Sequence, residues 1–221
     1  MNITTQLQEI TAKLPSHVTL VAVSKTKPNE DLQEAYEAGQ RIFGENKVQE
    51  LVQKQEDLPK DIKWHFIGHL QKNKVKYLAP FVDLIHSIDS LSLLKEINKR
   101  AKQNERVIKV LLQIHIAQED SKFGFDKTEL ISAIHNKELD FKNIEVVGVM
   151  GMATNTDDEM LVKNEFANLK SIFEELKSDA FNQNTNFEII SMGMSGDYQL
   201  AIEQGSNMVR IGSTIFGDRN Y

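Results

Sequence analysis

Eight short, strongly apolar runs recur along this chain, and stretches with helical spacing separate them. The runs are continuous rather than alternating with polar residues, which is typical of strands that are buried on both faces of a parallel sheet. Strands that alternate with helices in this way predict an α/β fold. The predicted strands cover residues 18–24, 41–44, 64–68, 84–88, 107–116, 144–150, 187–193 and 209–217.

The first residues predict an opening helix. They place Ile3, Leu7, Ile10 and Leu14 on one helical stripe, and they lack the basic start and apolar stretch of a signal peptide. Further helices are predicted over residues 29–39, 89–104, 160–178 and 195–205.

Eight repeats of strand and helix within 221 residues favour a closed (β/α)8 barrel with an extra N-terminal helix. An open, doubly wound sheet is the alternative, because periodicity alone does not reveal closure. Neither a linker-like change in composition nor a low-complexity tract interrupts the chain. We therefore expect one domain over residues 1–221.

Composition excludes several classes of function. A net charge of -6 and a pI near 5.6 argue against nucleic-acid binding, which needs clustered Lys and Arg. The absence of cysteine excludes disulfides, a thiolate nucleophile and a sulfur-ligated metal, and fits a cytoplasmic protein. No apolar run reaches the roughly 18 residues of a membrane span, so no membrane is expected.

Lys25 follows the first apolar run, in phase with Val21 and Val23. In a barrel, function collects where the strands end, and the face that buries these valines would carry the lysine amine toward the interior. Most lysines at strand ends are simply solvated, so Lys25 needs support from the rest of the chain.

The last two strand ends predict an anion site. Gly193 and Ser195 mark one junction, with Ser195 as the expected N-cap of the next helix, and Gly212, Ser213 and Thr214 mark the other. Small residues, hydroxyls and exposed backbone amides at such junctions suit phosphate, although an ordinary serine cap is the plainer interpretation.

Arg210 lies between Val209 and Ile211, so it faces the barrel interior if these neighbours face the helices. A buried guanidinium needs an acceptor, since an unpaired one is costly. That acceptor is either a ligand or a structural carboxylate such as Glu188.

A Schiff-base amine, a phosphate cup and a polar group near a ring nitrogen together suit pyridoxal 5′-phosphate (PLP). Two alternatives share parts of this chemistry. A lysine aldolase acting on sugar phosphates needs the same amine and cup, and a phosphometabolite sensor needs the cup without a covalent bond.

The chain resembles the pyridoxal phosphate homeostasis family, also called the proline synthase co-transcribed family. The resemblance covers nearly the whole length in five ordered blocks: "AVSKTKP" (22–28), "FGENKVQE" (43–50), "WHFIGHLQKNK" (64–74), "SKFGF" (121–125) and "SMGMSGDYQLAIEQGSNMVRIGSTIFGDRNY" (191–221). It implies a single barrel similar to the N-terminal barrel of alanine racemase.

The resemblance also implies roles for individual residues. Lys25 would form the Schiff base and Arg210 would face the pyridine nitrogen. The expected cofactor-binding residues are Lys25, Asn46, Ser191, Ser195, Arg210, Gly212 and Ser213. Lys27 and Lys122 match family lysines near the site.

Lys47 departs from the tyrosine that is more frequent in the family after "FGEN", which affects the expected lining of that wall. His65 and His69 invite a metal interpretation, but they have no evident carboxylate partner in phase. We expect no metal, and we expect His65 to be a core or pocket-wall residue.

An arginine beside the ring nitrogen makes the cofactor a weak electron sink, and the chain stops before the extra domain that completes a racemase. The sequence therefore predicts a monomeric carrier that stores, buffers or delivers PLP, with PLP-dependent apo-enzymes as recipients. A weak amino-acid racemase or decarboxylase is the enzymatic alternative.

Overall fold

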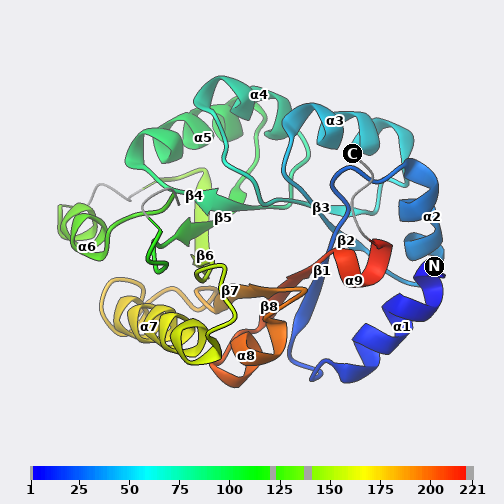
Figure 1. The fold of residues 1–221 in the computed structure, drawn as a ribbon. Coiled ribbons are helices and arrows are strands. Elements are labelled where there is room, and N and C mark those ends of the chain that lie inside the picture. Colours follow the sequence, from blue (N-terminus) through cyan, green and yellow to red (C-terminus); the bar gives the residue numbers. More distant parts are fainter. Residues whose placement is uncertain (1, 120–122, 137–140, 218–221) are drawn as a thin grey trace.

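The computed structural model describes residues 2–119, 123–136 and 141–217. Within these ranges, eight parallel strands close into a barrel in sequence order, and β1 pairs with both β2 and β8 (Figure 1). The strands are β1 (Thr19–Val23), β2 (Ile42–Glu45), β3 (Lys63–Phe66), β4 (Leu84–Ile88), β5 (Ile108–Gln113), β6 (Ile144–Met150), β7 (Ile189–Met194) and β8 (Met208–Ile211). The predicted closed barrel is confirmed, and the open sheet is excluded.

Helices surround the barrel (Figure 1). They are α1 (Ile3–Lys13), α2 (Asn29–Glu37), α3 (Val48–Asp57), α4 (Val75–Leu78), α5 (Leu91–Gln103), α6 (Lys127–His135), α7 (Glu159–Ser178), α8 (Tyr198–Glu203) and α9 (Ser213–Phe216), with a 3-10 turn η1 (Lys72–Lys74). The predicted opening helix is confirmed as α1. Among the described residues, no helix is both long enough and apolar enough to cross a membrane.

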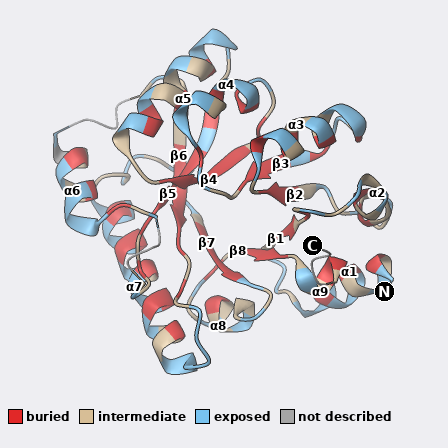
Figure 2. Ribbon diagram, turned by 45° about the horizontal axis from the view of Figure 1, so that its top comes forward, coloured by how far each residue is buried: buried red, intermediate tan, exposed pale blue. Residues whose placement is uncertain are grey.

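Alternation along the strands separates two layers of packing. In β8, Val209 and Ile211 join the large core between strands and helices, whereas Met208 joins a small cluster made of strand residues alone. In β1, Val21 joins this small cluster and Ala22 the large one. The small cluster therefore fills the barrel interior. The strands are mostly buried, and the outward faces of the helices are exposed (Figure 2).

Two predicted boundaries were wrong at the strand ends. The run at 209–217 was expected to be one strand, but β8 ends at Ile211 and a short helix, α9, begins at Ser213. The run at 107–116 is likewise shorter, because β5 ends at Gln113. Apolar residues beyond these points, such as Ile215, pack into the core from non-strand backbone.

Candidate functional site

A cavity of about 410 Å³ lies at the carboxyl ends of the strands. Its lining includes residues that directly follow β1, β2, β7 and β8. The predicted site residues that line it are Lys25, Asn46, Ser195, Arg210, Gly212 and Ser213. Chain segments from the two ends of the sequence meet here because β1 pairs with β8.

Strand alternation explains the position of Lys25. Val21 points into the barrel, so Val23 and Lys25 share its face and line the cavity. The intervening residue, Ser24, points the other way and is buried on the helix side, where Lys54 contacts it. Lys25 is thus the amine that strand β1 delivers to the cavity.

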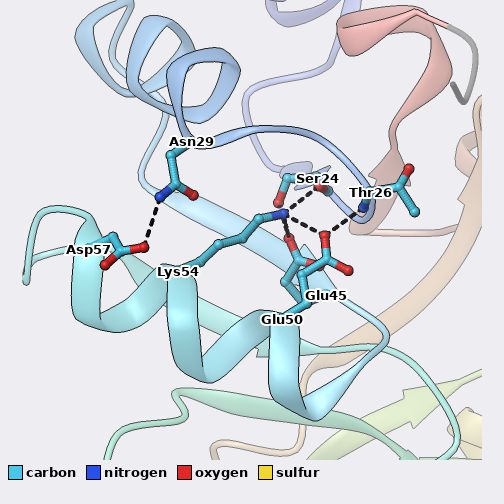
Figure 3. Close-up of polar contacts among 7 residues, drawn as sticks. All are labelled: Ser24, Thr26, Asn29, Glu45, Glu50, Lys54 and Asp57. Carbon is cyan, nitrogen blue, oxygen red and sulfur yellow. Dashed lines mark hydrogen bonds and ion pairs between the residues drawn. The ribbon is translucent and has the colours of Figure 1, made fainter.

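A buried ionic cluster on α3 holds the residues on either side of the cavity lysine (Figure 3). Lys54 Nζ donates to the carbonyl of Ser24 and to one carboxylate oxygen each of Glu45 and Glu50, all at 2.8 Å. Ser24 Oγ donates to Glu45 at 2.7 Å, and the backbone N–H of Thr26 donates to Glu50 at 2.6 Å. Both flanking peptides are therefore tied to one helix.

Glu45 is the buried acid of this cluster. Burial raises the pKa of its carboxyl above the ordinary value, against the opposing effect of Lys54. Its second oxygen, Oε2, has no hydrogen-bond partner among the described residues. Glu45 alternates with Gly44 and Asn46, so it faces α3 rather than the cavity.

Asn46 contributes a polar group to the cavity wall. Its Oδ1 is buried and lacks a hydrogen-bond partner in the described part of the chain. The loop after β3 passes close beside it, because a Cβ on Gly68 would lie 2.4 Å from the Asn46 carbonyl oxygen. An unsatisfied acceptor on a cavity wall is a group that a ligand can pair.

The loops after β7 and β8 form the opposite wall. The N–H of Gly212 donates to Ser195 Oγ at 3.2 Å, so the two loops are joined directly. Ser195 was expected to be the N-cap of the following helix, and this was wrong: the cap of α8 is Asp197. The Ser195 hydroxyl instead faces the second loop, and Ser213 begins α9 next to Gly212.

Arg210 lies at the floor of the cavity and is buried. Its Nη1 donates to Ser191 Oγ at 2.6 Å, and its Nη2 donates to the carbonyl of Gly151 at 3.1 Å. Glu188, the structural partner considered from the sequence, is not among its partners. Burial lowers the pKa of Arg210 to about 10, so the guanidinium stays charged at neutral pH.

Ser191 does not line the cavity, because it lies within the barrel beneath Arg210. Its expected contact with a phosphate stays a prediction, whereas its contact with Arg210 is direct. His86, which the sequence analysis did not single out, reaches the same hydroxyl with its Nδ1 at 3.0 Å. The strand "LIHSI" carried the only sequence signal for His86, a polar residue in phase with Leu84.

His65 is buried beside His86, as expected for a core residue. The expectation that the histidines lack carboxylate partners was wrong. His65 Nε2 lies 3.5 Å from Asp83, and His69 Nδ1 lies 3.0 Å from Asp89. Even so, no group of three or more metal-ligating side chains occurs within the described ranges.

Two further lysines were expected near the site. Lys27 lines the cavity and donates to the carbonyl of Phe216 at 2.8 Å, which joins the loop after β1 to α9. Lys122 lies outside the described residues. Lys47, the departure from the family pattern, is exposed at the N-cap of α3 and is not part of the cavity lining.

The chain matches the family model described as "Alanine racemase, N-terminal domain" over residues 1–220. It is 40% identical to the pyridoxal phosphate homeostasis protein of Aquifex aeolicus over 91% of this chain and 87% of that protein. It is 42% identical to the pyridoxal phosphate homeostasis protein of Homo sapiens over 91% of this chain and 77% of that protein. PipY of Synechococcus elongatus, solved with PLP bound, superposes with a TM-score of 0.89 at 34% identity, over 97% of this chain and 100% of PipY.

Proposed function

Since this chain belongs to the family of pyridoxal phosphate homeostasis proteins, we propose that it binds PLP and that it stores, buffers or delivers this cofactor in the cytoplasm. The observation that carries the proposal is that Lys25, Arg210 and the two loops joined at Ser195 and Gly212 all line the same cavity.

The cavity fits a ligand of this size and polarity. Its volume of about 410 Å³ lies within the range of small-molecule sites. It combines the amines of Lys25 and Lys27, one buried guanidinium, an unsatisfied amide oxygen at Asn46, and a wall of small residues and hydroxyls. Gly212 lets the loop after β8 pack closely against β1, since a Cβ there would lie 2.9 Å from the carbonyl oxygen of Val23.

Each wall has a separate task in this proposal. Ser195, Gly212 and Ser213 hold the phosphate, and Arg210 faces the ring nitrogen. Bound PLP supplies an aldehyde that condenses reversibly with a primary amine to a Schiff base. Lys25, which lines the cavity, provides that amine.

The chemistry of Arg210 favours a carrier over an enzyme. A guanidinium only donates hydrogen bonds and holds its proton tightly, so it does not protonate a ring nitrogen as an acid would. Carbanion formation on a bound amino acid is therefore poorly supported. We further propose that residues 1–221 form one cofactor-binding domain, that it acts as a monomer, and that PLP-dependent apo-enzymes receive the cofactor.

Borohydride trapping tests the site. Wild-type protein incubated with PLP and reduced should carry one pyridoxyl group on the peptide that contains Lys25. The Lys25→Ala variant should lose it, whereas Lys27→Ala, which removes a second cavity lysine, should keep it. A label scattered over exposed lysines would contradict the site, and phosphate affinity without a visible band would favour the non-covalent sensor.

A second measurement separates carrier from enzyme. Loaded wild-type protein should restore the activity of a PLP-dependent apo-enzyme, and it should do so faster than the Lys25→Ala protein loaded to the same occupancy and assayed in parallel. The same loaded protein, incubated with a panel of free amino acids, should neither racemise nor decarboxylate them at useful rates. Robust turnover would replace the carrier proposal with the enzymatic alternative.

A further inference from the structure

A continuous row of polar side chains runs through the barrel interior, away from the cavity. Arg210 Nη1 contacts Ser191 Oγ at 2.6 Å, and Ser191 Oγ contacts His86 Nδ1 at 3.0 Å. His86 Nε2 contacts His65 Nδ1 at 3.0 Å, and His65 Nε2 lies 3.5 Å from Asp83 Oδ2. Asp83 directly precedes β4, so the row ends at the opposite, amino-terminal end of the strands.

The chemistry of the first member fixes the direction of the next bonds. A guanidinium only donates, so Ser191 Oγ accepts from Arg210. Among the described residues, the partners of that hydroxyl are Arg210 and His86, so its own proton is satisfied only by donation to His86 Nδ1. His86 must then carry its proton on Nε2, from which it donates to His65.

The carboxylate at the far end requires the same direction. Asp83 accepts, so His65 places its Nε2 proton toward Asp83 and leaves its Nδ1 free to accept from His86. The reversed arrangement would turn the lone pair of His65 Nε2 toward a carboxylate. It would also leave the buried Ser191 proton without an acceptor.

Both histidines are held neutral. Burial lowers the pKa of His65 and lowers that of His86 well below the ordinary value. Arg210 lowers the pKa of His86 further, and Lys63 and Lys109 act on His65 in the same sense. Asp83 opposes these effects only at His65.

We propose that Arg210, Ser191, His86, His65 and Asp83 form a one-way hydrogen-bond chain that fixes both histidines as Nε2–H tautomers and orients the guanidinium in the cavity. Ser191, His86, His65 and Asp83 are thus positioning residues for Arg210. The tautomers are a property of the protein alone, whereas the effect on the cofactor rests on the proposed function.

Histidine NMR on the ligand-free protein tests the chain directly. With 15N-labelled histidine, His65 and His86 should both show a protonated Nε2 and an unprotonated Nδ1 near pH 7. Assignment comes from His65→Gln and His86→Gln, each of which removes one set of signals. A protonated Nδ1 at either residue, as an Nδ1–H tautomer or as an imidazolium, would overturn the proposal.

The remote end of the chain gives the functional test. Asp83→Asn keeps the shape of the side chain but presents an amide, which can either accept or donate and so no longer fixes the direction of the chain. It should weaken PLP binding by about two- to tenfold, the range of one hydrogen bond. Binding of inorganic phosphate should stay unchanged, because the phosphate wall is formed by other loops. Asp83→Glu retains the carboxylate and should restore both the tautomers and PLP affinity.

Asp61→Asn is the matched control, since Asp61 is another aspartate with polar contacts, to Arg41 at 3.3 Å and to Tyr36 at 2.8 Å. It should alter neither affinity. Equal losses for PLP and phosphate in Asp83→Asn would indicate a general structural defect and overturn the positioning role. Absence of PLP binding in wild type would overturn the proposed function and leave the tautomer result standing.

Discussion

Thr26 adopts a backbone conformation that β-branched residues rarely occupy, with φ at 66°. It directly follows the cavity lysine, and its N–H is held by Glu50. Such strain persists only where surrounding contacts enforce it, and it often occurs at functional sites. Thr26 therefore links the ionic cluster on α3 to the placement of Lys25.

Replacing Thr26 by glycine should stabilise the fold. Glycine adopts positive φ without a Cβ clash, so the variant should gain about 1 kcal/mol in free energy of unfolding, measured by urea denaturation. Glu105→Gly, at the other described non-glycine residue with positive φ, is the control and should gain a similar amount. Only Thr26→Gly should slow trapping of PLP on Lys25. A loss of stability in Thr26→Gly would contradict the strain interpretation.

At the scale of elements, helix α3 holds the end of strand β1 through Lys54, a lysine whose side chain is buried. One Nζ compensates two carboxylates, Glu45 and Glu50, and a backbone carbonyl. Removing one partner of a buried ion pair leaves uncompensated charge, which costs far more than the pair contributes. This helix therefore anchors the end of β1 by charge as well as by apolar packing.

Lys54→Met should destabilise the protein by about 3–5 kcal/mol in urea unfolding, because the buried carboxylate of Glu45 loses its cation, as does the partly exposed carboxylate of Glu50. Lys170→Met is the matched control. Lys170 pairs with Glu174 on the surface of α7, and its loss should cost less than about 0.5 kcal/mol. Similar losses in both variants would mean that the α3 cluster contributes no more than a surface pair.

Strand positions and the inward faces of Lys25 and Arg210 were predictable, because they depend on apolar runs and on alternation within one strand. The buried position of Lys54 was not predictable, because the stretch "ELVQKQED" is typical of a solvated helix and gives no sign that Glu45 lies beneath it. The contact between His86 and Ser191 joins residues 105 positions apart, so it exists only once the barrel is closed. Side-chain partners across strands need a three-dimensional structure.

At the scale of the whole molecule, the two buried histidines make stability depend on pH. Their pKa values in the fold are below the ordinary 6.5, so the unfolded chain binds more protons as the pH falls. The stabilisation that comes from keeping these histidines neutral is complete above about pH 6.5. It is lost as the pH falls from there through the pKa values of the histidines in the folded protein. Asp83, Lys63, Lys109 and Arg210 are the charged groups that act on the pair.

The free energy of unfolding should therefore fall by up to about 1.4 kcal/mol per pH unit for each histidine below about pH 6.5. Urea unfolding at about pH 7.5 and 5.5 measures the slope. His86→Gln should reduce this slope by the equivalent of about one bound proton. His17→Gln, which changes an exposed histidine, should leave the slope as it is. The raised pKa of Glu45 changes the slope in the opposite sense, so the test compares the slope of His86→Gln with that of wild type rather than using the wild-type slope alone. An identical slope in His86→Gln would contradict the prediction.

Closure of the barrel through β1 and β8 brings Val21 opposite Arg210 and lets Lys27 reach a carbonyl 189 positions away. During translation the first strand leaves the ribosome long before the last, and contacts of such high sequence separation form late and slowly. A nascent chain thus exposes Lys25 without its opposite wall for most of its synthesis. The cavity becomes complete only when the final strand is inserted, because that strand brings Arg210 and the loop in which Gly212 contacts Ser195.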